Sequence, residues 1–296
     1  MKKVTTALLI LLPFFIFAKV KVVGTIPDYT SIAKEIGGER VTVETLVKGT
    51  QDPHFADALP SHIIRLNRAD LLISTGLGLE SGWLPALLKN ARNKKIQQGS
   101  EGFLEASRFV SLLDIPAKID KSMGDVHPGG NPHFYTAPDQ LFLIAKAVKN
   151  RLKIIDPQGK EYYEKQWTDF KTRYSQEVKK WKEKVKGMEG TRIVVYHESW
   201  VYLLKWLGFE KVGALEPKPG IPPSAGHVSR LLKRIKGKDV KFIFQEIYHP
   251  TSLSKVFSKK SGIRLLILPS MTGAQKDVKT IWDKFDAIIN KITKGE

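Results

Sequence analysis

Cysteine is absent from this chain of 296 residues. Its absence excludes disulfides, thiolate zinc sites and a lipid anchor attached through a cysteine. The sequence also lacks the GxxxxGK[ST] phosphate-binding loop, the HExxH pair of zinc proteases and the GxSxG turn of serine hydrolases. These absences argue against nucleotide hydrolysis by this chain and against the common hydrolase classes.

Acidic residues are scarce relative to basic ones, with 30 Asp and Glu against 48 Lys and Arg. Such an excess of positive charge is found in proteins that bind nucleic acid or anionic membranes. Here many lysines fall on predicted helix surfaces among glutamates, and no RNA-binding aromatic motif accompanies them. We therefore expect a charged, solvent-facing surface and no nucleic-acid partner.

Long apolar runs are absent except at the N-terminus. Residues 1–18, MKKVTTALLILLPFFIFA, combine Lys2 and Lys3 with about a dozen apolar residues and end at the small residue Ala18. This pattern predicts a cleavable secretory signal, because the run is shorter than the roughly 20 residues that a membrane anchor needs. We expect a periplasmic, freely soluble monomer without stable membrane insertion, whose formal charge falls from +18 to +16 once Lys2 and Lys3 are removed.

After the signal, short runs rich in β-branched residues alternate with helical stretches. The order strand, helix, strand predicts parallel pairing with right-handed crossovers. We assign residues 19–157 to an N-terminal α/β lobe. Its predicted strands are 19–25, 41–47 and 70–76, its predicted helices are 28–37, 60–69, 80–92 and 137–155, and residues 107–132 are predicted to form a long loop.

The longest periodic segment covers residues 158–187. Its apolar residues recur every three or four positions and form one helical stripe on an otherwise charged surface. At 1.5 Å per residue, this helix would be about 45 Å long, enough to connect two lobes. A coiled-coil dimer is the alternative, but the stripe lacks the Leu and Ile seam of such dimers. The stripe consists of Tyr163, Trp167, Phe170, Tyr174, Val178, Trp181 and Val185.

The alternation restarts in residues 188–296, which we assign to a C-terminal α/β lobe. A stiff turn, EPKPGIPPSAG, interrupts it, and Ser224 is the predicted N-cap of the helix that follows. The predicted fold is therefore two α/β lobes with parallel sheets, joined by one long helix. The predicted strands of this lobe are 192–199, 211–217, 240–247 and 263–269, and its predicted helices are 200–207, 224–236, 251–260 and 276–293.

Two histidines occupy the same local setting. His54 in DPHF and His133 in NPHF each lie between a proline and a phenylalanine, and a proline restricts both its own backbone and that of the residue before it. Ligands of parallel sheets bind outside the carboxyl ends of the strands. His54 follows a predicted strand, His197 follows RIVVY and Glu246 ends VKFIFQE, so all three obey this rule.

Three neutral imidazoles and one carboxylate form a common ligand set for Zn²⁺, and they also suit other divalent transition metals. We therefore predict a metal site in the cleft between the lobes, formed by His54, His133, His197 and Glu246. The remaining histidines lack this context and are expected to be surface or loop residues, with the one nearest to His133 in sequence as the first exception to consider. They are His62, His127, His227 and His249.

A long pattern, DPH…PS…L…AD…GxGLE…W, ends at Trp83 and is followed by GNPHFYTAPD, the long helix and VVYHESWVYLLKWLGFE. In these motifs the chain resembles the periplasmic zinc- and manganese-binding proteins of ABC importers, the cluster A-I substrate-binding proteins. The resemblance covers nearly the whole chain after the signal.

The resemblance implies that His54, His133 and His197 are metal ligands. The fourth ligand of the family is usually an aspartate after the last strand, where this chain reads LPSMTGA and has no acid. Glu246 takes that place in our assignment, with Glu198 or a water as alternatives. The His- and Asp-rich loop of many zinc-specific members is also missing, since residues 107–132 contain a single histidine.

The resemblance further implies a receptor without enzymatic activity, which captures a divalent metal and delivers it to an ABC permease driven by a separate ATPase. Zinc is preferred because nitrogen ligands dominate the set, whereas manganese, the other candidate, tolerates oxygen-rich sites better. Adhesin-like or anion-binding roles and a secreted metallohydrolase are the alternatives. The hydrolase would need a general base beside an open metal position.

Overall fold

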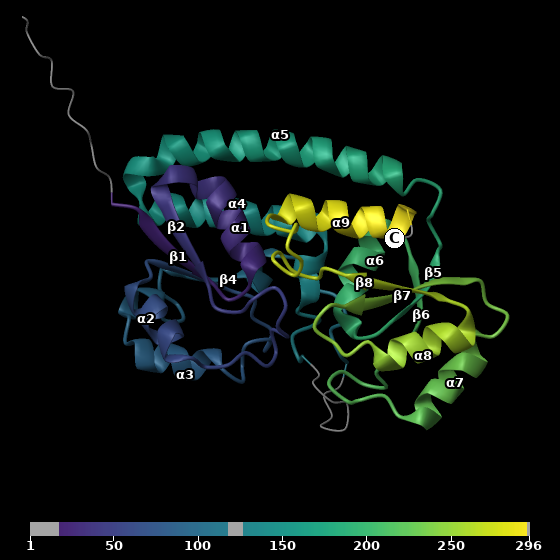
Figure 1. Ribbon diagram of the computed structural model, residues 1–296. Coiled ribbons are helices and arrows are strands. Elements are labelled where there is room, and N and C mark those ends of the chain that lie inside the picture. Colours follow the sequence, from purple (N-terminus) through teal and green to yellow (C-terminus); the bar gives the residue numbers. More distant parts are fainter. Residues whose placement is uncertain (1–17, 118–126, 295–296) are drawn as a thin grey trace, which may run out of the picture.

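The computed structural model describes residues 18–117 and 127–294. The predicted signal segment therefore lies outside the described residues, apart from Ala18. The described part forms two α/β lobes, and one long helix runs along both of them (Figure 1). The predicted fold class is thereby confirmed. Within the described ranges, no helix is both long and apolar enough to cross a membrane.

The N-terminal lobe contains a four-stranded parallel sheet in the order β2–β1–β3–β4. Its inner strands are almost entirely buried, as is usual for parallel sheets covered by helices. The edge strand β4 was not predicted, because three residues are too few to show a period. The strands are β1 (Val20–Gly24), β2 (Val41–Thr45), β3 (Leu71–Ser74) and β4 (Phe103–Glu105), and the helices are α1 (Pro27–Gly37), α2 (Pro60–Arg68), α3 (Leu84–Ala91) and α4 (Pro138–Ile155).

The C-terminal lobe repeats this topology, with a parallel sheet in the order β6–β5–β7–β8. The hydroxyl of Ser224 accepts a hydrogen bond from the backbone N–H of His227, so the predicted N-cap is confirmed. The strands are β5 (Arg192–Val195), β6 (Glu210–Ala214), β7 (Val240–Glu246) and β8 (Arg264–Leu268), and the helices are α6 (Val201–Leu207), α7 (Ala225–Ile235), α8 (Ser252–Ser261) and α9 (Ile281–Lys294).

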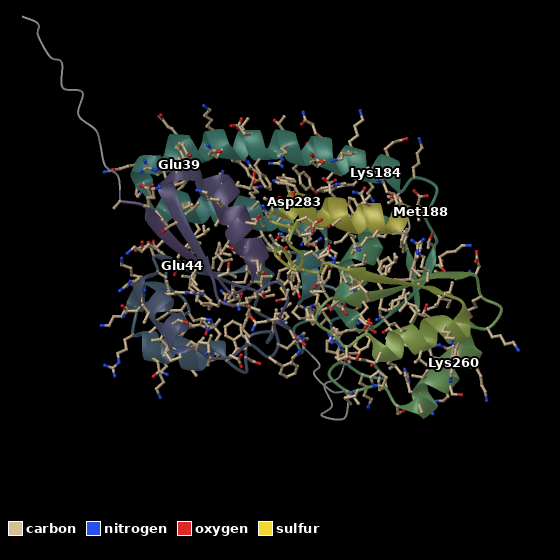
Figure 2. The ribbon with its side chains drawn as sticks, in the orientation of Figure 1. Glu39, Glu44, Lys184, Met188, Lys260 and Asp283 are labelled. Atoms are coloured by element: carbon tan, nitrogen blue, oxygen red, sulfur yellow. The ribbon has the colours of Figure 1, made fainter. Side chains whose placement is uncertain are left out.

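The long helix α5 (Lys160–Lys184) has 25 residues, which gives a length of about 37 Å. It is shorter than predicted at both ends, because the segment Pro157–Gly159 forms a 3₁₀ turn, η6, before it and residues 185–187 form a turn after it. The predicted stripe faces inward, and side chains fill the space between α5 and the two lobes (Figure 2). Its fully or nearly fully buried members are Tyr163, Trp167, Phe170, Trp181 and Val185.

A second helix, α9, also connects the two halves of the molecule. It packs along α5 and contacts α1 of the N-terminal lobe. The ammonium group of Lys284 on α9 is fully buried, pairs with the buried carboxylate of Asp28 on α1 and donates a hydrogen bond to the carbonyl oxygen of Tyr135 at 2.8 Å. The lobes are thus joined by more than the one helix that the sequence indicated.

Candidate metal site

His54 lies in the loop between β2 and α2, and its position is fixed from both sides. Its backbone N–H and its ring Nδ1 both bond to one carboxylate oxygen of Asp52, at 3.0 and 2.8 Å. The indole N–H of Trp83 donates to the carbonyl oxygen of Pro53 at 3.0 Å and holds the loop against the lobe. The imidazole is therefore aimed by its own loop, as the flanking proline suggested.

His133 begins the 3₁₀ turn η5 (His133–Thr136) and is 1% exposed. Its backbone N–H donates to the side-chain oxygen of Asn131 at 2.9 Å, and its ring Nδ1 lies 2.9 Å from the hydroxyl of Tyr135. The amide of Asn131 donates in turn to the carbonyl oxygen of Glu198 at 2.8 Å. This bond ties the turn that carries His133 to the C-terminal lobe.

His197 follows β5, at the carboxyl end of the second sheet, and precedes the 3₁₀ turn η7 (Glu198–Trp200). Its ring Nδ1 donates to a carboxylate oxygen of Glu216 at 2.7 Å, and both side chains are more than nine-tenths buried. Glu216 lies two residues after the end of β6, the neighbouring strand. Like His197, Glu216 lies outside the carboxyl end of a parallel strand, where ligands bind. It was not among the predicted site residues.

Two pairs of ring Nε2 atoms, from four histidines, lie close together between the lobes. The distance is 3.2 Å between those of His133 and His197, and 3.3 Å between those of His54 and His127. Ligand atoms of the three predicted histidines all lie within 4.8 Å of one another. With Zn–N bonds of about 2.0–2.1 Å, neighbouring ligands of a tetrahedral zinc ion are about 3.3–3.4 Å apart. The spacing therefore suits a divalent ion held by nitrogen.

Each of these four rings has its other nitrogen, Nδ1, occupied by an oxygen atom. The partners are the carboxylates of Asp52 and Glu216, the hydroxyl of Tyr135 and, for His127, the carbonyl oxygen of Leu77 at 2.8 Å. A hydrogen bond at Nδ1 fixes the tautomer that leaves the Nε2 lone pair free for a metal, and it makes the ring a better ligand. The cluster is thus organised as metal-binding histidines usually are.

Burial lowers the pKa of His133 well below its ordinary value, and the neighbouring histidines add to the shift. Burial also opposes protonation of His197, but the hydrogen bond to Glu216 and the charge of Glu246 outweigh it, so the pKa of His197 is raised. A metal ion can bind only neutral imidazole. A divalent cation bound at this place would stabilise the buried carboxylates of Glu216 and Glu246, as a proton on His197 does in its absence.

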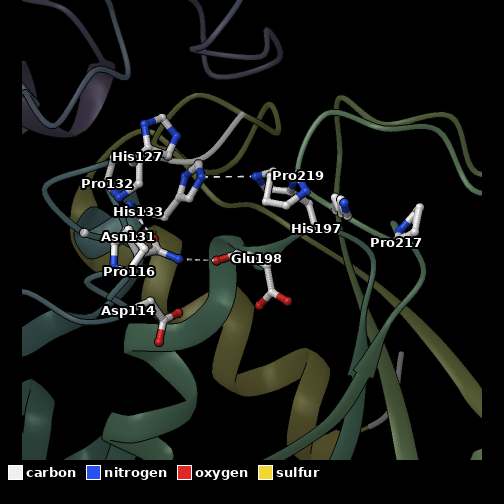
Figure 3. A pocket seen from close by; sticks show the side chains of 12 residues that line it. Asp114, Pro116, His127, Asn131, Pro132, His133, His197, Glu198, Pro217 and Pro219 are labelled. Atoms are coloured by element: carbon white, nitrogen blue, oxygen red, sulfur yellow. Dashed lines mark hydrogen bonds between the residues drawn. The ribbon is translucent and has the colours of Figure 1, made fainter. Parts of the chain in front are cut away.

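The predicted fourth ligand, Glu246, does not belong to the group formed by His54, His133 and His197. It ends β7 fully buried, burial raises its pKa to about 7, and Nε2 of His249 lies 3.7 Å from its carboxylate. Its role as a ligand stays a prediction. The alternative Glu198 instead bonds to Lys211 at 2.6 Å, and Figure 3 shows its carboxylate directed away from the histidines.

The remaining histidines have different surroundings. His127, the first exception we considered, lies beside His54, with 3.3 Å between their Nε2 atoms, but it does not belong to the group formed by His54, His133 and His197. His249, expected as a surface or loop residue, is a loop residue 3.7 Å from Glu246, and burial lowers its pKa to about 4. His227 is partly exposed on α7, whereas His62 was wrongly expected at the surface and is 5% exposed on α2.

A cavity of about 290 Å³ opens onto the histidines from solvent. Its walls come from both lobes, with His127 and His133 on one side and His197 and the turn at Pro217 and Pro219 on the other (Figure 3). The site is therefore placed between the lobes and reached from one face. Fold and site together define a class, the two-lobed α/β proteins that hold a small ligand in an interlobe cleft.

The chain belongs to the family described as zinc-uptake complex component A, periplasmic (ZnuA), whose model matches residues 22–295. A manganese ABC transporter substrate-binding lipoprotein, PsaA of Streptococcus mitis, is 23% identical over 94% of this chain and 89% of that protein. The high-affinity zinc uptake system protein ZnuA of Bacillus subtilis is 25% identical over 88% of this chain and 81% of that protein. The resemblance stated from the motifs is thus confirmed.

Solved structures support the same fold. A crystal structure of ZnuA superposes with a TM-score of 0.76 at 21% identity, covering 93% of this chain and 98% of that one. The substrate-binding protein FpvC of Pseudomonas aeruginosa, in complex with Mn²⁺, gives 0.75 at 21% identity, covering 94% of this chain and 100% of that one. Relatives of this family are substrate-binding components of metal ABC transporters and not enzymes, so a metallohydrolase finds no support.

Proposed function

We propose that the protein captures a divalent transition metal, zinc in the first place, outside the cytoplasm and delivers it to an ABC permease driven by a separate ATPase. The observation that carries the proposal is the grouping of His54, His133 and His197, whose ligand atoms all lie within 4.8 Å of one another and whose Nδ1 atoms each bond to an oxygen. His54, His133 and His197 are the proposed ligands, and His127, whose Nε2 lies 3.3 Å from that of His54, is a candidate for the fourth place beside the predicted Glu246.

Manganese is the second candidate, because the buried carboxylates of Glu216 and Glu246 stand behind His197. Oxygen ligands favour Mn²⁺ relative to a set made of nitrogen alone. If Glu246 entered the coordination sphere, the site would resemble the three-histidine, one-carboxylate set predicted from the sequence. The three grouped histidine nitrogens argue for zinc.

Export by a cleaved signal, a monomeric state and the division into lobes at residues 157 and 187 belong to the same proposal. A receptor of this kind works as a single two-lobed unit that meets its permease outside the cytoplasm. The hydrogen bond between Asn131 and Glu198 and the ion pair between Asp28 and Lys284 already link the lobes within one chain. No second copy is required to complete the cleft.

Metal analysis of protein purified without chelator, followed by a competition titration of stripped protein, tests the proposal. We expect one equivalent of zinc per chain, displaced by manganese only at large excess. A ligand that binds the native state alone stabilises it by about 2.7 kcal/mol at a hundredfold excess over Kd, so zinc should raise the melting temperature and magnesium should not. Protein that binds neither zinc nor manganese would refute the proposal.

A further inference from the structure

The two ring nitrogens of His197 face two different groups of potential ligands. Its Nε2 lies 3.2 Å from that of His133, toward the N-terminal lobe. Its Nδ1 lies 2.7 Å from the carboxylate of Glu216, within the C-terminal lobe. On that second side, ligand atoms of His197, Glu216 and His249 all lie within 4.8 Å of one another. Each of these three residues follows a strand of one sheet.

The same place holds buried polar atoms without partners. Both carboxylate oxygens of Glu246 and the Nε2 of His249 are buried and make no hydrogen bond with any part of the chain that the structure describes. Glu246 is 0% exposed, and its carboxylate lies 3.7 Å from that nitrogen. An unsatisfied buried polar atom costs about 1–3 kcal/mol, so such atoms need a reason. Lone pairs that converge from nitrogen and oxygen attract a cation.

We propose that His197, Glu216 and His249, with Glu246 beside them, form a second metal position that belongs to the C-terminal lobe alone. This inference rests on the proposed function, since the ion is the same cargo. In the second position the metal binds Nδ1 of His197 in place of the proton shared with Glu216. That proton leaves to solvent and Nε2 takes one up, so the ring stays neutral. The two positions are therefore alternatives for one ion.

The two metal positions differ in which lobe supplies their ligands, and this difference explains how both would serve metal transfer. The first site takes His54 and His133 from the N-terminal half of the chain and His197 from the C-terminal lobe, so any separation of the lobes breaks it. The second position keeps all of its ligands when the lobes separate. Its carboxylates also make it less favourable for zinc than the imidazole ligands of the first site. An ion that leaves the cleft thus passes through a weaker site before it reaches the permease.

The experiment uses a variant without the ligands of the first site, His54→Ala/His127→Ala/His133→Ala, loaded with Co²⁺ as a spectroscopic probe. We expect it to bind one equivalent of Co²⁺ more weakly than the wild type does, with a changed visible spectrum. Addition of His249→Ala should weaken the remaining binding by at least about 10–100-fold, because loss of a direct ligand costs no less than loss of a group that only supports a ligand. Addition of His227→Ala is the matched control, because this ring bonds to the carbonyl oxygen of Ala214 and should have no effect.

Two results would overturn the inference: a folded triple variant that binds no Co²⁺, or one whose binding is unaffected by His249→Ala. If the wild type itself bound no metal, the proposed function would fail, and the two failures are thereby distinguished. If the triple variant does not fold, His249→Ala alone decides the matter. In this variant the rate at which a chelator removes zinc should change several-fold, while the equilibrium affinity for zinc stays within about twofold. An unchanged rate would refute the second position.

Discussion

The two lobes share one strand order, yet they offer a metal different chemistry. The N-terminal half contributes three imidazoles, those of His54, His127 and His133, from irregular segments. The C-terminal lobe contributes His197, backed by the buried carboxylates of Glu216 and Glu246 at the ends of neighbouring strands. One topology thus carries a nitrogen-rich half and an acid-rich half of the same cleft.

This difference teaches where specificity in such a cleft is decided. The sheets only bring strand ends to one place, and the residue after each strand sets the chemistry. Nitrogen ligands favour zinc and oxygen ligands favour manganese. A change of one residue after a strand can therefore shift the preference without any change of fold.

The largest expected effect comes from removing one ligand on either side of the cleft. His133→Ala and His197→Ala should each weaken zinc binding by orders of magnitude, because each removes an Nε2 that the other histidines cannot replace. A competition titration measures the loss, and His227→Ala serves as the control with unchanged affinity. Wild-type affinity in either variant would show that this half of the cleft does not bind the ion.

The next effect concerns the link between the halves. Lys284→Met leaves the buried carboxylate of Asp28 without its ammonium partner, which costs about 3–5 kcal/mol of unfolding free energy. Urea denaturation of the metal-free protein measures this cost. The double variant Asp28→Asn/Lys284→Met removes both charges and should recover much of the loss. A single variant as stable as the wild type would mean that the pair does not hold the halves together.

A smaller effect compares the two carboxylates that support the ligands. Asp52→Asn acts on His54 and Glu216→Gln acts on His197, and each should lower zinc affinity by about 10–100-fold, because the bond at Nδ1 orients the ring and raises its basicity. Both measurements use the same competition titration. Since Glu216 also lies in the proposed second position, its variant should release zinc at an altered rate as well. If zinc left the Asp52→Asn and Glu216→Gln variants at equal rates, Glu216 would have no role in zinc release beyond its support of His197.

The smallest effect is expected in overall shape. Helices α5 and α9 pack along both halves, and α5 contains no proline or glycine at which it could bend sharply. Metal release should therefore involve the loops around the site and a modest tilt of the lobes. Small-angle scattering of metal-free and zinc-loaded protein measures this. A change of several ångströms in the radius of gyration would indicate a wide hinge closure instead.

Much of the fold could be predicted because its signals are local. The stripe from Tyr163 to Val185 predicted α5, and runs of β-branched residues predicted seven of the eight described strands, all but β4. Boundaries were less accurate. The segment Pro157–Gly159 had no signal that separates a 3₁₀ turn from the first turn of a helix.

The sequence by itself determined that two α/β lobes form, that a long helix joins them, and that His54, His133 and His197 are the residues to examine. Periodicity and the residues beside proline express themselves over a few positions, so they can be read along the chain. Only the tertiary structure decided that His127 lies beside His54, that Glu216 bonds to His197, and that Lys284 pairs with Asp28. These contacts join residues 19 to 256 positions apart. Their geometry exists only once both sheets and the helices across them have packed.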